Sequence, residues 1–479
     1  MTKIIVNGRE VEADPKKPLI AACHESGVDV PNYCYHPGLE PVGSCRICQV
    51  EVKEGERPAR VVVACRTPVT EGMVVNTESE GAHDARRACL EFLLKDHPLD
   101  CPICDKAGEC TLQDYTYAEG QAAGQSAEPR QNFEKRKSLG DVVLLDQERC
   151  ILCSRCVRFF EEVTGKSQLA ITGLGSRSRI ETFADRDLTG NYQGNITDLC
   201  PVGALTLKPF RFKARVWNLF KKSSTCGECS RGCSISVEVL RQGDVKRIRP
   251  RYNEAVNRWW ICDTGRFAID AANPEGRIPA VTRGYNGMQA CEVDDALEVV
   301  RSAYQAYDKH VLIASPWMTV EEGKALKELA ISLGAEALFA SPAPNTLKDD
   351  LLHTGDPCPN RRGLEELGFV AKTPAELTEI LSTAQTATLF GERIAQTIGH
   401  EILAELSGDL RLFLFDVEAV SSPALHAACG VATWVERTGT WVNIDGHKGK
   451  LSAARPAPSG VRQPLSLINA LLQTEASTR

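Results

Sequence analysis

The first part of the chain carries short runs in which apolar and polar residues alternate. These runs have the two-residue period of half-buried strands, and glycine and proline turns separate them. This pattern predicts a small open sheet over residues 1–78. The predicted strands are Lys3–Val6, Gln49–Val52, Arg60–Ala64 and Met73–Val75.

A helical period follows over Asp84–Asp96. Asp84 can cap the first turn, because its carboxylate can accept hydrogen bonds from the free N–H groups there. Pro98 cannot continue the helix, which places His97 at its C-terminal end. The side that we expect to be buried carries Ala85, Ala88, Phe92 and Leu93.

After about residue 271 the pattern changes, and short apolar strands alternate with helices. Thr319-Val-Glu-Glu322 is a capping box that begins a helix to Leu333, which Gly334 ends. Thr373 and Pro374 begin another helix. This alternation predicts an α/β domain. The strands predicted within it are Val311–Ser315, Ala337–Ala340, Ala387–Phe390 and Leu412–Phe415.

Composition and charge narrow the class of protein. A length of 479 residues suggests about three or four domains, and 43% hydrophobic residues suffice to form cores. A net charge of -7 without a basic run argues against a nucleic-acid or anionic-membrane surface. The N-terminus lacks the apolar core of a secretory signal, and no apolar run approaches the roughly 18 to 20 residues of a membrane helix. We therefore expect a protein of the cytoplasm, or of an equivalent organelle compartment, without a membrane span.

The 20 cysteines are unlike a disulfide framework, because most of them fall into closely spaced groups typical of metal sites. The first set has the spacing C-x10-C-x2-C-x16-C, and a [2Fe-2S] ferredoxin-like domain is the favoured interpretation. The spacing differs from that of plant-type ferredoxins, and a zinc site remains the alternative. The first set comprises Cys34, Cys45, Cys48 and Cys65.

The second set combines one histidine with three cysteines within fourteen residues. On its own, this set is as compatible with structural zinc as with an iron–sulfur cluster, since Cys3His is a common zinc ligand set. The second set comprises His97, Cys101, Cys104 and Cys110.

The third set has three cysteines at three-residue steps and a distant fourth that precedes proline, which favours a [4Fe-4S] cluster. It comprises Cys150, Cys153, Cys156 and Cys200. The fourth set also favours a [4Fe-4S] cluster, with a zinc ribbon as the alternative. It comprises Cys226, Cys229, Cys233 and Cys262. The remaining cysteines are scattered singly, and we interpret them as structural: Cys23, Cys89, Cys291, Cys358 and Cys429.

The sequence lacks two common nucleotide-binding motifs. The sequence contains neither G-x-G-x-x-G nor a Walker A motif, so it gives no sign of binding NAD(H) or ATP itself.

In their order and spacing, the four sets resemble the large iron–sulfur subunit of respiratory complex I, NADH:quinone oxidoreductase, which is the G-type subunit in bacteria and the 75 kDa type elsewhere. The resemblance implies that the first set binds one [2Fe-2S] cluster and that the other three sets each bind a [4Fe-4S] cluster. The fourth of these clusters is one that only some bacterial members keep. The resemblance covers residues 1 to about 270.

The C-terminal part looks like a shortened molybdopterin-oxidoreductase domain, for which Asp356-Pro-Cys-Pro-Asn360 and Thr433-Trp-Val-Glu-Arg-Thr-Gly-Thr440 are two of the similar segments. About two hundred residues cannot enclose a pterin metal centre, so we expect none. The resulting fold class is an α+β [2Fe-2S] ferredoxin-like domain and small iron–sulfur domains followed by an α/β molybdopterin-oxidoreductase-like domain. The expected domain bounds are 1–78, 79–118, 138–215, 219–275 and 276–479.

The resemblance implies an electron-relay subunit in the peripheral arm of a proton-translocating NADH:quinone oxidoreductase, with no catalytic residue and no substrate chemistry on this chain. The implied partners are the NADH/FMN-binding subunit, a small [2Fe-2S] subunit, a two-cluster ferredoxin subunit and a quinone-site module. The complex would lie on the cytoplasmic side of the inner, or plasma, membrane. Two alternatives stay open: the diaphorase-side subunit of a soluble NAD-linked hydrogenase or formate dehydrogenase, and a non-redox zinc scaffold.

Overall fold

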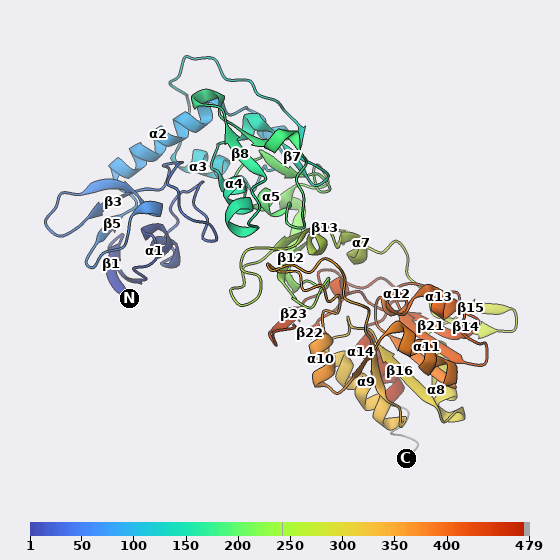
Figure 1. Ribbon diagram of the computed structural model, residues 1–479. Coiled ribbons are helices and arrows are strands. Elements are labelled where there is room, and N and C mark those ends of the chain that lie inside the picture. The colour runs from blue at the N-terminus through green and yellow to red at the C-terminus, as the bar shows by residue number, and fades with distance from the viewer. Residues whose placement is uncertain (242, 474–479) are drawn as a thin grey trace. The chain divides into compact units, whose positions relative to one another are not determined.

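The computed structural model describes residues 1–241 and 243–473. Its internal contacts divide the chain into two units, Met1–Asn218 and Leu219–Arg479. The first unit contains a ferredoxin-like sheet and small helical and stranded segments, and the second is built on a large mixed sheet (Figure 1). The fold class predicted from the sequence, α+β iron–sulfur domains followed by an α/β region, is confirmed.

A five-stranded sheet in the order β2-β1-β5-β3-β4 forms the beginning of the first unit. β1 and β5 pair in parallel, and the other neighbours are antiparallel. Leu19 and Ile20 of helix α1 (Leu19–Glu25) share an apolar core with Ile4 and Val50 of the sheet. All four predicted strands form here, whereas β2 and α1 were not predicted. The strands are β1 (Thr2–Val6), β2 (Arg9–Ala13), β3 (Gln49–Lys53), β4 (Arg60–Val63) and β5 (Val74–Asn76).

The long helix α2 (Glu80–Asp96) corrects the sequence-based expectation in two respects. It begins at Glu80, because the Ser79 hydroxyl, and not Asp84, caps the first turn by accepting a hydrogen bond from Ala82 N at 3.2 Å. The predicted buried face was also wrong, since Phe92 is 81% exposed. The buried residues of the helix are Ala82, Arg86 and Leu90. The expectation that His97 follows the last turn is confirmed.

Short elements complete the first unit and carry the second and third sets. The strands form a three-stranded sheet in the order β10-β7-β6 and a separate β8-β9 pair. They are β6 (Lys137–Ser138), β7 (Val143–Leu145), β8 (Leu169–Thr172), β9 (Arg179–Thr182) and β10 (Leu205–Leu207). The helices are α3 (Thr111–Glu119), α4 (Arg155–Arg158) and α5 (Asn195–Leu199). A π-helical turn, Phe159–Val163, extends α4.

The second unit is built on an eight-stranded sheet in the order β15-β14-β21-β20-β19-β16-β17-β18. The strands from β21 to β18 are parallel, and β14 and β15 are antiparallel. The strands are β14 (Val281–Gly284), β15 (Gly287–Ala290), β16 (His310–Ala314), β17 (Ala337–Ala340), β18 (Val370–Lys372), β19 (Thr386–Phe390), β20 (Arg411–Asp416) and β21 (Leu425–Gly430).

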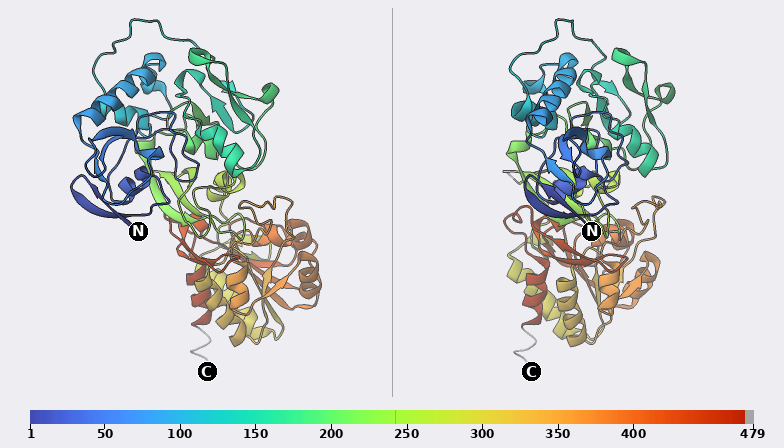
Figure 2. Two further views of the ribbon diagram at one scale, coloured as in Figure 1. Left: turned by 60° about the vertical axis from the view of Figure 1, so that its left-hand side comes forward. Right: turned by 90° about the vertical axis from the view of Figure 1, so that its left-hand side faces the viewer.

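Successive residues of the central strands face two different cores. On β20, Leu412 and Leu414 belong to one core, whereas Phe413 and Phe415 belong to the other. Both faces of the sheet are therefore covered, which explains why these strands read as continuous apolar runs. Figure 2 shows the helices on both sides of the sheet. They are α8 (Val293–Ala306), α9 (Val320–Ser332), α10 (Arg361–Glu366), α11 (Pro374–Thr383), α12 (Ile394–Ile398), α13 (His400–Ala404) and α14 (Pro464–Leu472).

The predicted capping box at Thr319 is present, and the predicted helix start at Thr373 also forms a capping box. The Thr319 hydroxyl accepts a hydrogen bond from Glu322 N at 3.2 Å, and the Glu322 carboxylate accepts one from Thr319 N at 2.8 Å. Thr373 and Glu376 make the same pair of contacts at the start of α11. Gly334 ends α9 at a φ of +64°, a conformation that favours glycine.

The fourth set lies in a smaller part of the second unit, which packs on the α/β region. Its strands are β11 (Leu219–Thr225), β12 (Ser234–Leu240) and β13 (Val245–Pro250), with the short helices α6 (Asp263–Arg266) and α7 (Ile269–Ala272). The pair β22 (Gly439–Val442) and β23 (Lys448–Leu451) packs against β11. The indole of Trp317 donates a hydrogen bond to Gly227 O at 2.8 Å, which ties the cysteine loop to the large sheet.

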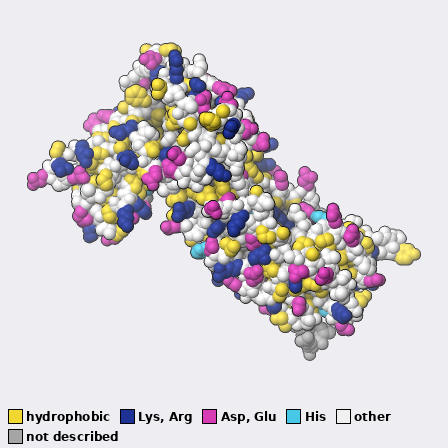
Figure 3. Space-filling view, viewed as in Figure 1, with side chains coloured by type: hydrophobic (Ala, Val, Ile, Leu, Met, Phe, Trp, Pro, Cys, Tyr) yellow, Lys and Arg dark blue, Asp and Glu magenta, His cyan; other side chains and the backbone are white. Residues whose placement is uncertain are grey.

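Basic and acidic side chains are interspersed on the face of the molecule in Figure 3, as the sequence without a basic run predicts. Within residues 1–241 and 243–473, every helix is too short or too polar to cross a membrane.

Candidate metal centres

The first set is assembled by the turns of the ferredoxin-like sheet. Pairing of β3 with β4 places Cys48, just before β3, beside Cys65, just after β4, and their thiols are hydrogen-bonded. The Cys34 thiol contacts those of Cys45 and Cys65, and Cys34 N donates to Cys45 Sγ at 3.4 Å. The structure therefore brings all four members of the first set together.

The electrostatics of the first set favour a negatively charged sulfur group. Hydrogen bonds from the Cys45 and Cys65 thiols hold the pKa of Cys34 well below its usual range. Gly43 and Arg46 adopt left-handed backbone conformations, with φ of +67° and +59°. Such turns direct successive N–H groups to one side and form a concave site for anions. The first set thus fits a cluster whose ligands are thiolates.

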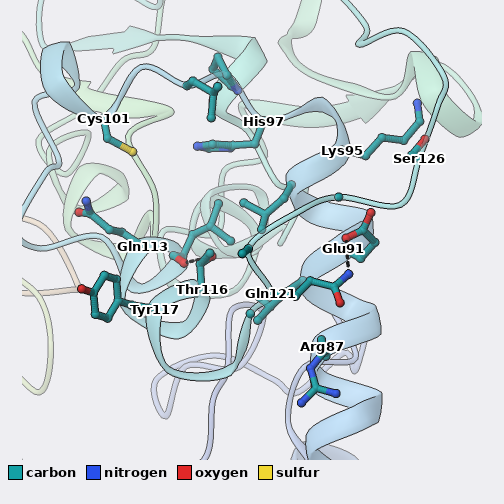
Figure 4. A pocket seen from close by; sticks show the side chains of 18 of the residues that line it. Arg87, Glu91, Lys95, His97, Cys101, Gln113, Thr116, Tyr117, Gln121 and Ser126 are labelled. Atoms are coloured by element: carbon teal, nitrogen blue, oxygen red, sulfur yellow. Dashed lines mark hydrogen bonds between the residues drawn. The ribbon is translucent and has the colours of Figure 1, made fainter.

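The second set lies where α2 ends and α3 begins. His97 follows the last turn of α2, Cys101 begins a short 3-10 turn, and Cys110 precedes α3. His97, Cys101 and Cys110 line a cavity of about 510 Å³. In Figure 4 the His97 imidazole and the Cys101 sulfur point toward one another across this cavity. Cys101 is exposed, whereas Cys104 and Cys110 are buried.

Cys104 is the member of the second set that does not line the cavity. Its thiol packs against the Gly203 backbone, where an added Cβ would lie 2.2 Å from Cys104 Sγ. Burial is the main cause that raises the pKa of Cys110 to about 11, and the Cys104 and Cys200 thiols raise it further. Cys104 therefore lies on the side of the second set that faces the third set.

His97 has the properties of a neutral ligand. Burial lowers its pKa to about 4, and the nearby Arg149 charge lowers it further, so the imidazole is uncharged at neutral pH. Its Nδ1 atom is buried without a hydrogen-bond partner in the described structure. A buried ring nitrogen without a partner is costly, and coordination of a metal would satisfy it.

The third set lines one apolar cavity together with Leu145, Ile180 and Leu205. Leu152 and Ser154 have left-handed backbones, with φ of +53° and +61°, and Leu152 N donates to Cys150 Sγ at 3.4 Å. Burial raises the pKa of Cys150 to about 12 and that of Cys153 to about 11. All four thiols of the third set thus face a site from which water is largely excluded.

The cysteines of the fourth set lie between the end of β11 and the start of β12, and just before α6. Cys226 N donates to Cys233 O at 2.8 Å, and Cys262 Sγ accepts a hydrogen bond from Gly265 N at 3.4 Å. An added Cβ on Gly265 would lie 2.8 Å from Cys226 Sγ, so glycine allows this approach. Burial raises the pKa of Cys262 to about 12. The four cysteines are each between 3% and 5% exposed.

Family comparisons match each of these regions. Residues 1–80 match a 2Fe-2S iron-sulfur cluster binding domain, and residues 86–122 match the NADH-ubiquinone oxidoreductase-G iron-sulfur binding region. Residues 140–206 match the ferredoxin-like domain of NADH-quinone oxidoreductase subunit 3. Residues 230–270 match the NADH-ubiquinone oxidoreductase NDSU1/NuoG-like 4Fe-4S domain. Over its iron–sulfur region, the chain is therefore similar to the large iron–sulfur subunits of NADH–quinone oxidoreductases.

Two relatives are identical to this chain at more than a third of the aligned positions. The chain is 39% identical over 341 residues to the mitochondrial NADH-ubiquinone oxidoreductase 78 kDa subunit of Neurospora crassa, a match that covers 70% of this chain and 45% of the relative. It is 34% identical over 337 residues to the G-type subunit of NADH-quinone oxidoreductase from Rickettsia typhi, with 70% and 49% covered. The chain spans about half the length of these curated relatives.

Among solved structures, a chain from the crystal structure of an NAD+-reducing [NiFe]-hydrogenase in the H2-reduced state is 30% identical, with a TM-score of 0.40. The match covers 45% of this chain and 91% of that chain.

This similarity agrees with the chemistry of the four sets. In an iron–sulfur cluster, the protein ligands are shared among several irons. Each set offers sulfur or imidazole ligands in a largely buried site, which fits the cluster type implied by the matched domains.

Sequence reasoning missed the arginines around the sites. Arg149, Arg155 and Arg158 all contact segments that carry predicted ligands. Their position beside the cysteines in the sequence Arg149-Cys150-Ile-Leu-Cys153-Ser-Arg155-Cys156-Val-Arg158 was the available signal. Arg86 is 1% exposed. It donates hydrogen bonds to Gln49 O, next to Cys48 of the first set, and to Thr77 O.

Proposed function

We propose that the chain is an electron-transfer subunit of NADH:quinone oxidoreductase. It would bind one [2Fe-2S] cluster at the first set and a [4Fe-4S] cluster at each of the other three. The observation that carries this proposal is the convergence of three sets within one unit. Thr111 N donates to Pro201 O at 3.1 Å, which joins the second set to the third, and Arg155 joins the third to the first.

Iron–sulfur clusters bound at these sites supply one-electron redox chemistry. The chain's own residues bind and shield them. Thiolates of the four sets are the ligands, and the neutral His97 replaces one thiolate, which reduces the negative charge at the second set. Apolar side chains such as Leu145 and Ile180 keep water from the third set. No acid, base or nucleophile is required for electron relay.

The proposal extends to the partners and the location. NADH would be oxidised on a flavin in the NADH/FMN-binding subunit, and the electrons would leave toward a quinone site in another module. The further partners would be the small [2Fe-2S] subunit and the two-cluster ferredoxin subunit. The complex would place this chain at the cytoplasmic side of the inner, or plasma, membrane. The curated relatives named as subunits of NADH–quinone oxidoreductase support this assembly.

Metal analysis and co-purification test the proposal. The purified chain should contain iron and acid-labile sulfide, and the reduced protein should give EPR signals of both cluster types. A colourless, zinc-loaded chain would refute an electron-transfer role. Purified from its source, the chain should carry membrane subunits with a quinone site, whereas association with a NiFe subunit would refute the complex I assignment.

The fourth set is proposed to lie off the electron path. It belongs to the second unit, whereas the other three sets converge in the first. Replacement of its buried ligand, Cys229→Ser, should remove that cluster's EPR signal and leave NADH-to-quinone turnover of the assembled complex nearly unchanged. Loss of turnover with a folded chain and intact other clusters would place the fourth set on the path.

A further inference from the structure

Helix α4 joins the first set to the third through a single arginine. From Nη1, Arg155 donates to Leu199 O at 3.1 Å, and Leu199 immediately precedes Cys200. From Nη2, it donates to Asn32 Oδ1 at 3.0 Å and to Tyr35 O, and Tyr35 immediately follows Cys34. One guanidinium group is thus bonded to the backbone beside a predicted ligand of each of two sites.

A second arginine of the same helix strengthens this junction. Arg158 donates from Nη2 to Cys34 O and from Nε to Ser154 Oγ at 3.1 Å. In addition, Glu40 N donates to the Glu162 carboxylate at 2.8 Å. The segment that follows Cys153 therefore holds the loop that carries Cys34 at several points.

Arg155 also faces the third set directly. It lines the same apolar cavity as the four cysteines of that set. Its Nε atom is buried and has no hydrogen-bond partner in the described part of the chain. An N–H group in this position can donate to a sulfur atom of a bound cluster, which would satisfy the otherwise costly orphan donor.

The charge of Arg155 acts on both sets. Burial lowers its pKa, and nearby thiols of both sets, Cys153 and Cys200 of the third and Cys45 and Cys34 of the first, oppose that shift. Guanidinium groups remain protonated in proteins, so Arg155 carries a permanent positive charge between the two sites. A positive charge stabilises the reduced, more negative form of each cluster by Coulomb attraction.

We propose that Arg155 is a positioning residue shared by two cluster sites, which fixes the backbone of Cys34 and Cys200 and raises the midpoint potential of both clusters together. The inference rests on the proposed function, because it presupposes that the first and third sets bind iron–sulfur clusters. It adds that the potentials of these two clusters are coupled through one side chain.

The test is an EPR-monitored redox titration of the cluster-loaded full chain and its Arg155→Gln variant. At a fixed ambient potential, the ratio of oxidised to reduced cluster should be about tenfold higher in Arg155→Gln than in the wild type, at both sites. For one electron, this change corresponds to a midpoint potential that is lower by about 59 mV. Arg155→Lys retains the charge and should restore most of both shifts. Arg177→Gln, which removes an exposed arginine of the same unit, should leave both potentials unchanged.

The outcomes separate the inference from the proposed function. A wild-type chain without iron–sulfur clusters refutes the proposed function. Clusters with unchanged potentials in Arg155→Gln, or a shift at only one of them, refute the shared role alone. If Arg155→Gln loses iron, the Arg155→Lys variant distinguishes the outcomes. Retention of iron in Arg155→Lys with near wild-type potentials supports the role of the charge. Equal loss of iron from both variants contradicts the role of the charge.

Discussion

At the scale of single residues, His97 differs from every other proposed ligand because an imidazole would bind a cluster as a neutral group. Its lowered pKa, about 4, follows from burial and from the Arg149 charge. A thiolate in the same place would add a negative charge and disfavour the uptake of an electron.

The variant His97→Cys should therefore retain a cluster at the second set but lower its midpoint potential by roughly 100 mV or more, since two His ligands raise the potential of Rieske centres by several hundred millivolts. A redox titration monitored by EPR measures the shift. Cys89→Ser, a change of a half-buried cysteine on α2 outside the four sets, is the control and should leave the potential of the second set unchanged. An unchanged potential in His97→Cys would remove the tuning role of the imidazole.

Asp416 is a buried carboxyl group at the end of β20. Burial raises its pKa to about 7, although Arg393 N, Ala395 N and Val417 N donate hydrogen bonds to it. The folded state thus keeps a proton that the unfolded state loses above about pH 4. Because the unfolded state binds fewer protons in this interval, stability falls as pH rises from about 4 to 7.

When the pH rises from 5 to 7.5, the titration of Asp416 should lower the free energy of unfolding of the second unit by about 2 to 3 kcal/mol. Urea unfolding followed by tryptophan fluorescence measures it at both pH values. Asp416→Asn should remove this part of the pH dependence, whereas Asp409→Asn, at an exposed position, should preserve it. The same pH dependence in wild type and Asp416→Asn would contradict the assigned pKa.

At the scale of elements, α2 is held in place by Arg86. Its guanidinium donates to Gln49 O, Thr77 O and the Glu119 carboxylate, with distances between 2.7 and 3.1 Å. The residue joins the first sheet to α2 and α3, the two helices that flank the second set.

Arg86→Met should destabilise the first unit by about 3 to 5 kcal/mol, because it leaves two carbonyls and Oε1 of the largely buried Glu119 carboxylate without their donor. Arg87→Met removes the neighbouring arginine, which is exposed and pairs with Asp84, so its effect should stay within about 0.5 kcal/mol. Thermal unfolding of the two variants compares them directly. Equal melting temperatures would show that Arg86 does not hold the helix.

Elements that depend on a few consecutive residues were predictable from the sequence. The capping box at Thr319 involves only four residues and forms as predicted, and the helix predicted to start at Thr373 does so. The start of α2 was not predictable in this way, since both Ser79 and Asp84 can cap a helix. Contacts of Arg86 with distant backbone groups fix which side of the helix is buried, and a local pattern cannot encode them.

The same reasoning applies to the candidate sites. Cysteine spacing predicted the sets, because the ligands of a loop lie close in the sequence. The contact of Arg155 with Tyr35 spans 120 residues, so only the fold brings the two together. Tertiary contacts of this kind account for the part of the sites that the sequence did not indicate.

At the scale of the whole molecule, the two units depend on their metal sites to different degrees. The second and third sets lie in short loops and small sheets of the first unit. The second unit has two apolar cores on its large sheet. Metal binding contributes most to folding where loops lack a core of their own.

Removal of the clusters by chelation or oxidation should therefore expose residues 1–218 to protease before the second unit. Mass spectrometry of the fragments should find a resistant product that begins near Leu219. The cluster-loaded protein, digested in parallel, is the control. Equal cleavage of both units after cluster loss would contradict this difference.

The attachment of the fourth set to the second unit also bears on its evolution. Ser230 N donates to Asp356 O at 2.9 Å, and Trp317 holds Gly227, so the large sheet supports this loop from outside the cysteines. Mutations that eliminate the four thiols therefore remove a ligand site without removing the support of its loop. A lineage that lost these four thiols would therefore keep the contacts that support the loop, so the proposed fourth cluster could disappear at a low cost in folding.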